Sequence, residues 1–158
     1  MPKSGKKANR TLNGYIGVAL IRAHRAFRQS GERRLAGLGL RLGQDLILLK
    51  LALREALSQT GLAEQLGVEQ ATLSIMLGRM EKAGLVRRRT DPEDARVTRV
   101  CATAKGLSLV GPVRRLWQEQ ERGLLRGLTE EDQKMLANLL ARLRANVESR
   151  RTAHDGRA

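Results

Sequence analysis

Cysteine and long apolar runs are scarce in this sequence, and each scarcity excludes a class of protein. The 158 residues include one cysteine, Cys101, so the chain can form no internal disulfide. A lone thiol fits a reducing compartment such as the cytoplasm. No run approaches the roughly 20 apolar residues that span a bilayer, because Lys50 interrupts the densest stretch, residues 46–53. The sequence therefore predicts a cytoplasmic protein without a membrane-spanning helix.

Aromatic residues and histidines are also few. With one Tyr, one Phe and one Trp, the core must be aliphatic, and a core rich in Leu and Ala favours helices. His24 falls in the middle of a predicted helix and His154 in the C-terminal tail, so the two histidines do not predict a metal cluster. There is no Cys–His pair, no Ser–His–Asp arrangement and no phosphate-binding glycine loop. We therefore expect no catalytic residues, no metal and no cofactor.

Acidic residues are also in the minority. Sixteen Asp and Glu face 30 Lys and Arg, which gives a formal net charge of +14. Such an excess indicates a polyanionic partner, either nucleic acid or an anionic membrane surface. A protein that is merely basic and soluble is the competing interpretation.

The first half of the chain is organised as an arm followed by helices. Residues 1–10 are predicted to be a disordered basic arm, and apolar positions at helical spacing predict a helix over residues 12–35. The arginines from Arg22 onward, without a small-residue cleavage pattern, favour an amphipathic helix over a secretory signal peptide. Residues 44–55 are apolar on nearly every side, which predicts a helix in the middle of the fold.

A pair of short helices follows. Ser58 is a good N-cap for a helix that runs through Leu66, and Gly67 is expected to end it. A second helix is predicted over residues 70–83, with a core face at i, i+3, i+4 and i+7 and a stop at Gly84.

The pattern then changes to strands and back to helices. Residues 85–90 and 97–102 are rich in Val, Thr and Arg and flank the turn-forming cluster Asp-Pro-Glu-Asp, which predicts a β-hairpin. Helices are predicted over 103–126 and 129–149, with Pro112 loosening the first near its start, and residues 150–158 are expected to be a flexible tail. The fold class is therefore mainly α with a small β-hairpin.

The order of short helix, glycine turn, second helix and basic hairpin favours binding of double-stranded DNA. A helix such as 70–83 fits the major groove, where each base pair presents a distinct donor and acceptor pattern. Arginines on the hairpin segment 87–99, called the wing below, suit the minor groove. Asp94 is predicted to orient the Arg96 guanidinium by a charge-assisted hydrogen bond. The predicted DNA-contacting residues are Ser58, Gln59, Thr60, Gln70, Ala71, Thr72, Ser74, Ile75, Arg79, Arg88, Arg89, Asp94 and Arg96.

Between residues 40 and 106 the chain resembles the multiple-antibiotic-resistance regulator (MarR) family of winged helix-turn-helix transcriptional regulators. Four segments carry the resemblance in the same order and spacing: LAEQLGV at 62–68, RMEKAGLVRR at 79–88, DPEDAR at 91–96 and TAKG at 103–106. The resemblance implies an obligate homodimer, a pseudo-palindromic operator and usually a small-molecule effector pocket. The helix-turn-helix and the wing predict a sequence-specific transcriptional regulator that acts as a repressor. It also implies a division into an N-terminal dimerisation helix (11–40), a DNA-binding domain (41–102) and C-terminal dimerisation helices (103–149).

Three positions depart from the family pattern. Ile75 stands where many relatives have a basic residue; it could touch a thymine methyl group but loses a phosphate or guanine contact. Gly61 cannot complete a capping box with Ser58, and Glu69 is a poor N-cap for the second helix.

Several alternatives remain open at this level. Arg87 to Arg89 could be a solvated strand face. Cys101 could be a redox sensor, although an inert small residue fits its strand position better. Trp117 and Tyr15 could line an effector pocket, although core or dimer interface fits their helical spacing better. The whole chain could be a non-specific architectural DNA-binding protein, or its first helix could bind a membrane surface.

Overall fold

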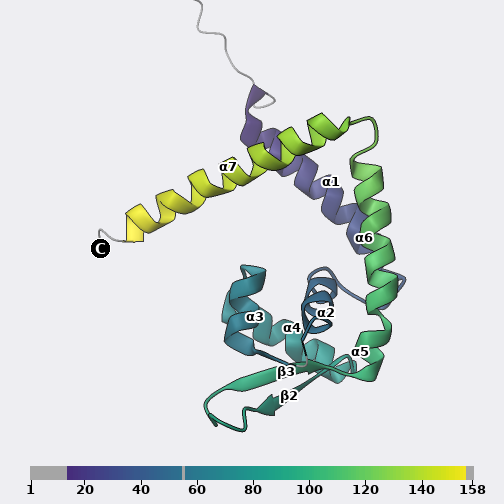
Figure 1. Cartoon of the computed structure of the whole chain (residues 1–158), viewed down its shortest axis with the longest axis vertical. Helices are drawn as coiled ribbons and strands as arrows, with labels where there is room; N and C mark the ends of the chain where they lie inside the picture. Colours follow the sequence, from purple (N-terminus) through teal and green to yellow (C-terminus); the bar gives the residue numbers. More distant parts are fainter. Residues whose placement is uncertain (1–13, 55, 156–158) are drawn as a thin grey trace, which may run out of the picture. The chain divides into compact units, whose positions relative to one another are not determined.

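The computed structural model describes residues 14–54 and 56–155 and has a mainly helical chain with one small sheet, as the sequence predicts (Figure 1). It divides into two compact units, residues 1–120 and 121–158. The basic arm predicted at residues 1–10 lies outside the described residues.

The first two helices confirm the predicted pattern with small differences in length. Helix α1 spans Ile16–Ala36, and α2 spans Gln44–Leu51. The predicted extension of α2 to residue 55 is wrong, because i to i−3 hydrogen bonds tighten the chain at Leu53 and Arg54 into a turn. That turn leads into β1 (Leu57–Ser58), a two-residue strand that the sequence pattern does not predict.

The helix pair begins and ends where its capping residues indicate. Helix α3 spans Gln59–Leu66, and the Ser58 side chain accepts a hydrogen bond from the backbone N–H of Gly61. Gly67 ends α3 at φ +64°, a left-handed conformation that glycine adopts without strain. Helix α4 spans Gln70–Lys82, and Glu69 provides no side-chain cap, as expected.

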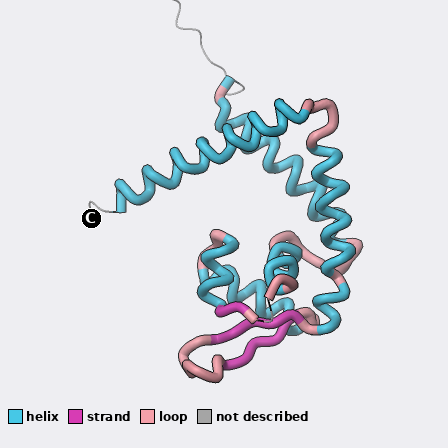
Figure 2. The backbone as a smooth tube through the Cα atoms, in the orientation of Figure 1, coloured by secondary structure: helices cyan, strands magenta, loops and turns pink. Residues whose placement is uncertain are grey.

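The hairpin is β2 (Val86–Thr90) paired antiparallel with β3 (Thr98–Ala102), and β1 adds on the other side of β3 (Figure 2). The register places Arg88 opposite Val100 and Arg89 opposite Arg99. Because side chains alternate across a strand, Val86 and Arg88 share the inner face, whereas Arg87 and Arg89 share the outer face.

The long helix predicted over 103–126 is divided into two. Helix α5 spans Ala104–Ser108 and α6 spans Val110–Leu124, with the break at Leu109. Pro112 explains the break, because it cannot donate to the carbonyl of Ser108 four residues earlier and its ring would clash there. Proline is tolerated in the first turn of α6, where backbone N–H groups have no helical partner.

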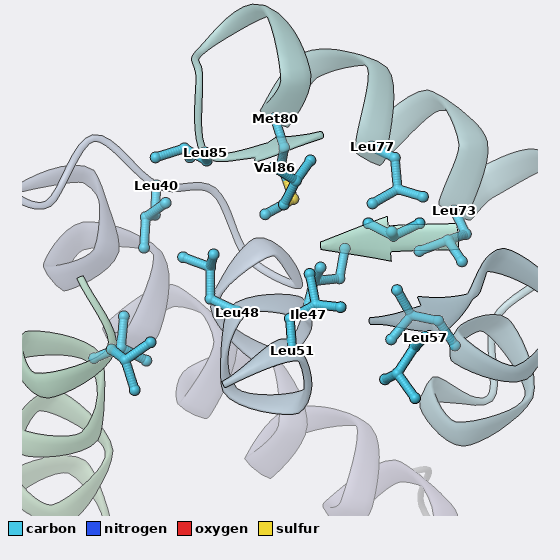
Figure 3. Close-up of a cluster of buried hydrophobic side chains, with 14 of the residues drawn as sticks. Leu40, Ile47, Leu48, Leu51, Leu57, Leu73, Leu77, Met80, Leu85 and Val86 are labelled. Carbon is cyan, nitrogen blue, oxygen red and sulfur yellow. The ribbon is translucent and has the colours of Figure 1, made fainter. Parts of the chain in front are cut away.

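The core of the first unit gathers around α2, as its apolar composition predicts. Figure 3 shows Ile47, Leu48 and Leu51 of α2 among the buried side chains of α4 and the sheet. Burying a side chain of this size stabilises a fold by about 1.5–3 kcal/mol. The labelled members of this core are Leu40, Ile47, Leu48, Leu51, Leu57, Leu73, Leu77, Met80, Leu85 and Val86.

Trp117 fixes α6 against α2 and α1. Its indole Nε1 donates to the buried Asp45 carboxylate at 3.0 Å, and its ring lies 5.9 Å from that of Phe27. Gln120 donates to the Phe27 carbonyl at 3.0 Å. The expectation that Trp117 is a packing residue is therefore confirmed.

The second unit is mainly helix α7, Glu130–Asp155, so the chain stays helical beyond the predicted end at residue 149. Thr129 and Asp132 form its N-terminal cap, with the Thr129 hydroxyl accepting from the Asp132 N–H at 3.2 Å. No helix in the described part of the chain is long and apolar enough to cross a membrane.

Candidate nucleic-acid interface

Helix α4 buries one face and leaves the opposite face open. Leu73, Leu77 and Met80 are fully buried against the core. The predicted contact residues on the open face are Gln70, Ala71, Thr72, Ile75 and Arg79, all of them exposed, with Ser74 half-buried beside them. This face presents amide, hydroxyl and guanidinium donors next to small apolar groups.

The start of α3 lies beside the start of α4. The Gln70 side-chain amide lies 3.5 Å from the Thr60 hydroxyl. Gln59 is half-buried and Thr60 is exposed, so the first turn of α3 extends the polar surface of α4. The hydrogen bond from Gly61 occupies the Ser58 hydroxyl oxygen as an acceptor, while its proton can still be donated to a ligand.

A cleft of about 260 Å³ joins these helix ends to the wing. Gln59 and Thr60 line it from α3 and Ser58 from the N-cap of that helix, Gln70 from α4, and Arg96, Val97 and Thr98 from the wing. Three segments that are separate in the sequence therefore present predicted contact residues to one cleft.

Asp91 organises the turn of the wing. Its buried carboxylate accepts from the backbone N–H groups of Glu93 (2.8 Å) and Asp94 (3.3 Å) and from the Arg99 guanidinium. The Glu93 N–H and the Arg99 side chain hold the pKa of Asp91 below its usual value of 3.8. The carboxyl group therefore stays ionised and closes the turn.

The role that the sequence suggested for Asp94 needs correction. Its carboxylate accepts from the backbone N–H of Arg96 at 2.9 Å, not from the Arg96 guanidinium. The Arg96 side chain is exposed at the wing tip. The carboxylate–guanidinium pair of the wing is Asp91 with Arg99, which spacing alone did not identify.

Arg88 and Arg89 lie differently although they are adjacent. Arg89 is exposed on the outer face of β2. On the inner face, the Arg88 guanidinium lies 3.3 Å from Glu81 of α4, and its backbone N–H donates to the same carboxylate at 3.1 Å. Arg88 therefore joins the wing to α4.

The remaining candidate residues lie away from this surface. Cys101 is buried on β3, as expected for an inert small residue. His24 is exposed on α1. Neither adds a chemical group to the cleft.

The arrangement supplies what binding to duplex DNA requires. A helix with an open polar face can donate and accept at base edges, while exposed arginines and backbone N–H groups at helix starts can neutralise phosphates. The described cleft is lined by no histidine, cysteine or carboxylate side chain.

Comparison with known proteins agrees with the resemblance found in the sequence. The MarR family profile matches residues 40–98. The chain is 30% identical, over 95% of its own length and 76% of the relative's, to the HTH-type transcriptional regulator TtmR of Methylorubrum extorquens (strain PA1).

Solved structures share the fold. The transcriptional regulator SlyA superposes with a TM-score of 0.78 at 28% identity, covering 85% of this chain and 94% of that one. The MepR–DNA complex of S. aureus gives a TM-score of 0.79 at 23% identity, covering 84% and 99%. The chain therefore belongs to the MarR family of winged helix-turn-helix transcriptional regulators.

Proposed function

We propose that this regulator binds specific sites on double-stranded DNA, with α4 in the major groove and the wing at the minor groove. The observation that carries the proposal is the cleft at which α3, α4 and Arg96 converge. A protein that used charge alone would not need donors and acceptors gathered at one helix face.

We propose that the active form is a homodimer on a pseudo-palindromic operator. Helix α7 exposes large apolar side chains at helical spacing, and α1 exposes others near its start. Surfaces of this kind mark association sites, and a two-fold dimer places two reading helices about one turn of DNA apart. The exposed residues are Ile16, Leu20 and Ile21 of α1 and Met135, Leu136, Leu139, Leu140, Leu143 and Val147 of α7.

The regulatory outcome that we propose is repression in the cytoplasm. A dimer seated on a promoter would exclude polymerase, and a small-molecule effector would release it, as the family resemblance implies. The domain roles follow the same scheme, with residues 11–40 and 103–149 in dimerisation and 41–102 in DNA binding.

A non-specific architectural protein is the second candidate, and the net charge of +14 favours it. Its binding would be indifferent to sequence and steeply dependent on salt. The concentration of polar groups on α4 favours the specific regulator.

The test compares the affinity for DNA from upstream of the protein's own gene with the affinity for a scrambled duplex across a salt series. A duplex pool of random sequence provides, by selection, preferred sites that do not depend on the choice of that fragment. The proposal predicts that preference for particular sequences persists at physiological salt. Equal affinity for all duplexes, decreasing together as salt rises, would contradict it and support the architectural function.

A further inference from the structure

Ile75 occupies the centre of the open face of α4. It is 60% exposed, and it lies four residues after Ala71 and four before Arg79, so the three share one stripe of the helix. Thr72, three residues earlier, brings its own methyl group to the same face. Ala71, Thr72 and Ile75 form a small methyl-bearing patch, called the methyl patch here.

The packing of the domain does not account for Ile75. The core face of α4 consists of Leu73, Leu77 and Met80 on the other side of the helix. At 60% exposure Ile75 adds little buried apolar area and belongs to no part of the core, and its branched side chain is a poorer helix former than alanine. On α4 the polar residues Ser74 and Arg79 border the side chain, so polar groups lie next to it as well as methyl groups.

The major groove presents one apolar group to such a patch. Thymine carries a C5 methyl group there, while the other base edges present hydrogen-bond donors and acceptors. Ile75 has no donor, so it cannot bind a phosphate or the guanine acceptors that a basic side chain would reach.

We propose that Ile75, supported by Ala71 and Thr72, determines specificity for a thymine by contacting its methyl group in each half-site. The inference rests on the proposed function, because it requires α4 to lie in the major groove. Burial of one methyl group corresponds to about a fourfold change in affinity for each half-site.

The experiment uses the full chain and removes the methyl group from the DNA. A preferred duplex is first enriched from a random pool with the unaltered protein. Each thymine is then replaced by deoxyuridine, which lacks the C5 methyl group and keeps the pairing edge. Dissociation constants are measured for the unaltered protein, for Ile75→Ala and for the control Leu53→Ala, whose side chain is 69% exposed in the turn after α2.

The inference predicts one symmetric thymine position at which deoxyuridine weakens binding about fourfold per half-site. In Ile75→Ala the same replacement should have little further effect, whereas Leu53→Ala should behave as the unaltered protein. A preferred duplex with no such thymine, or with equal sensitivity in Ile75→Ala, would overturn the inference and leave the proposed function standing. Enrichment of no sequence would overturn both.

Discussion

The Glu81 carboxylate of α4 binds Arg88 of β2 through two groups at once. One oxygen accepts the backbone N–H of Arg88 at 3.1 Å, and the other lies 3.3 Å from the guanidinium Nε. The guanidinium also lies over Gly78, where an added Cβ would meet it at 3.3 Å. Helix and wing are therefore fixed to each other beside the surface proposed to bind DNA.

Replacing Glu81 with alanine should loosen this connection. We expect the free energy of unfolding to decrease by about 1 kcal/mol, because the pair is partly exposed and its charge interaction is screened. DNA affinity should also decrease, since the wing would be less well positioned. Urea unfolding and fluorescence anisotropy measure the two effects.

The exposed Glu148, which pairs with Arg144 at 3.7 Å within α7, is the matched control. Glu148→Ala should change the unfolding free energy by less than about 0.5 kcal/mol. An equal response of both variants would show that the Glu81–Arg88 contact does not fix the wing.

Gly106 of α5 should not tolerate any side chain. A Cβ there would lie 2.1 Å from the Leu85 carbonyl oxygen and 3.1 Å from a Leu48 methyl group. We expect Gly106→Ala to lower the unfolding free energy by about 2 kcal/mol or more, since the backbone must move apart. At Gly123 of α6 a Cβ meets nothing within 4 Å, so Gly123→Ala should be neutral or stabilise by up to about 1 kcal/mol. If Gly106→Ala unfolded at the same temperature as the unaltered protein, the close packing of Gly106 against Leu85 and Leu48 would be refuted.

Removal of the Asp45 carboxylate should destabilise the junction of α2, α6 and α1. Asp45 is 1% exposed and accepts from the Gly43 N–H at 2.8 Å as well as from Trp117. Asp45→Ala leaves two donors without an acceptor, which should cost about 2–4 kcal/mol. Because Trp117 is the only tryptophan, its fluorescence follows unfolding directly.

Asp45→Asn is the informative companion variant. It keeps the shape of the side chain but turns one acceptor into a donor. The free energy of unfolding should therefore decrease less than in Asp45→Ala. Unfolding of Asp45→Ala at the same urea concentration as the unaltered protein would contradict this role.

The wing turn should depend on pH only under acid conditions. Because the pKa of Asp91 is lowered in the folded chain, its contribution is complete above the usual value of 3.8 and is lost as pH falls through the lowered pKa. The amide chemical shifts of Glu93 and Asp94 should therefore titrate with a midpoint below 3.8, and Asp91→Asn should abolish that transition. A midpoint at or above 3.8 would mean that the carboxylate is not stabilised by these partners.

Local signals in the sequence predicted most of the fold. Ser58, Gly67 and the periodicity of Leu73, Leu77 and Met80 determine where the reading helices begin, end and face. These features depend on neighbours within one or two turns, so spacing alone is sufficient to find them. Strand β1 is too short to have a pattern and exists only because Leu57 and Ser58 pair with β3.

The side-chain pairing at the wing was harder to predict. The turn contains two aspartates, and spacing does not reveal that Asp91 points inward to Arg99 while Asp94 binds backbone. Strand alternation does distinguish the neighbouring arginines: Arg88 lies two residues after the buried Val86, which places it on the inner face near α4. Arg89, one residue further, falls on the outer face by the same alternation.

The most direct test of the account measures DNA affinity after Arg96→Ala, with Arg114→Ala on α6 as a control of equal charge change. Both side chains are exposed, so neither variant should unfold. If the wing tip binds DNA, Arg96→Ala should weaken binding to the enriched duplex by about 1–3 kcal/mol and reduce the salt dependence by roughly one phosphate contact per subunit. Arg114→Ala should bind almost as the unaltered protein does. Equal affinity of the two variants would contradict the placement of the DNA interface at α4 and the wing.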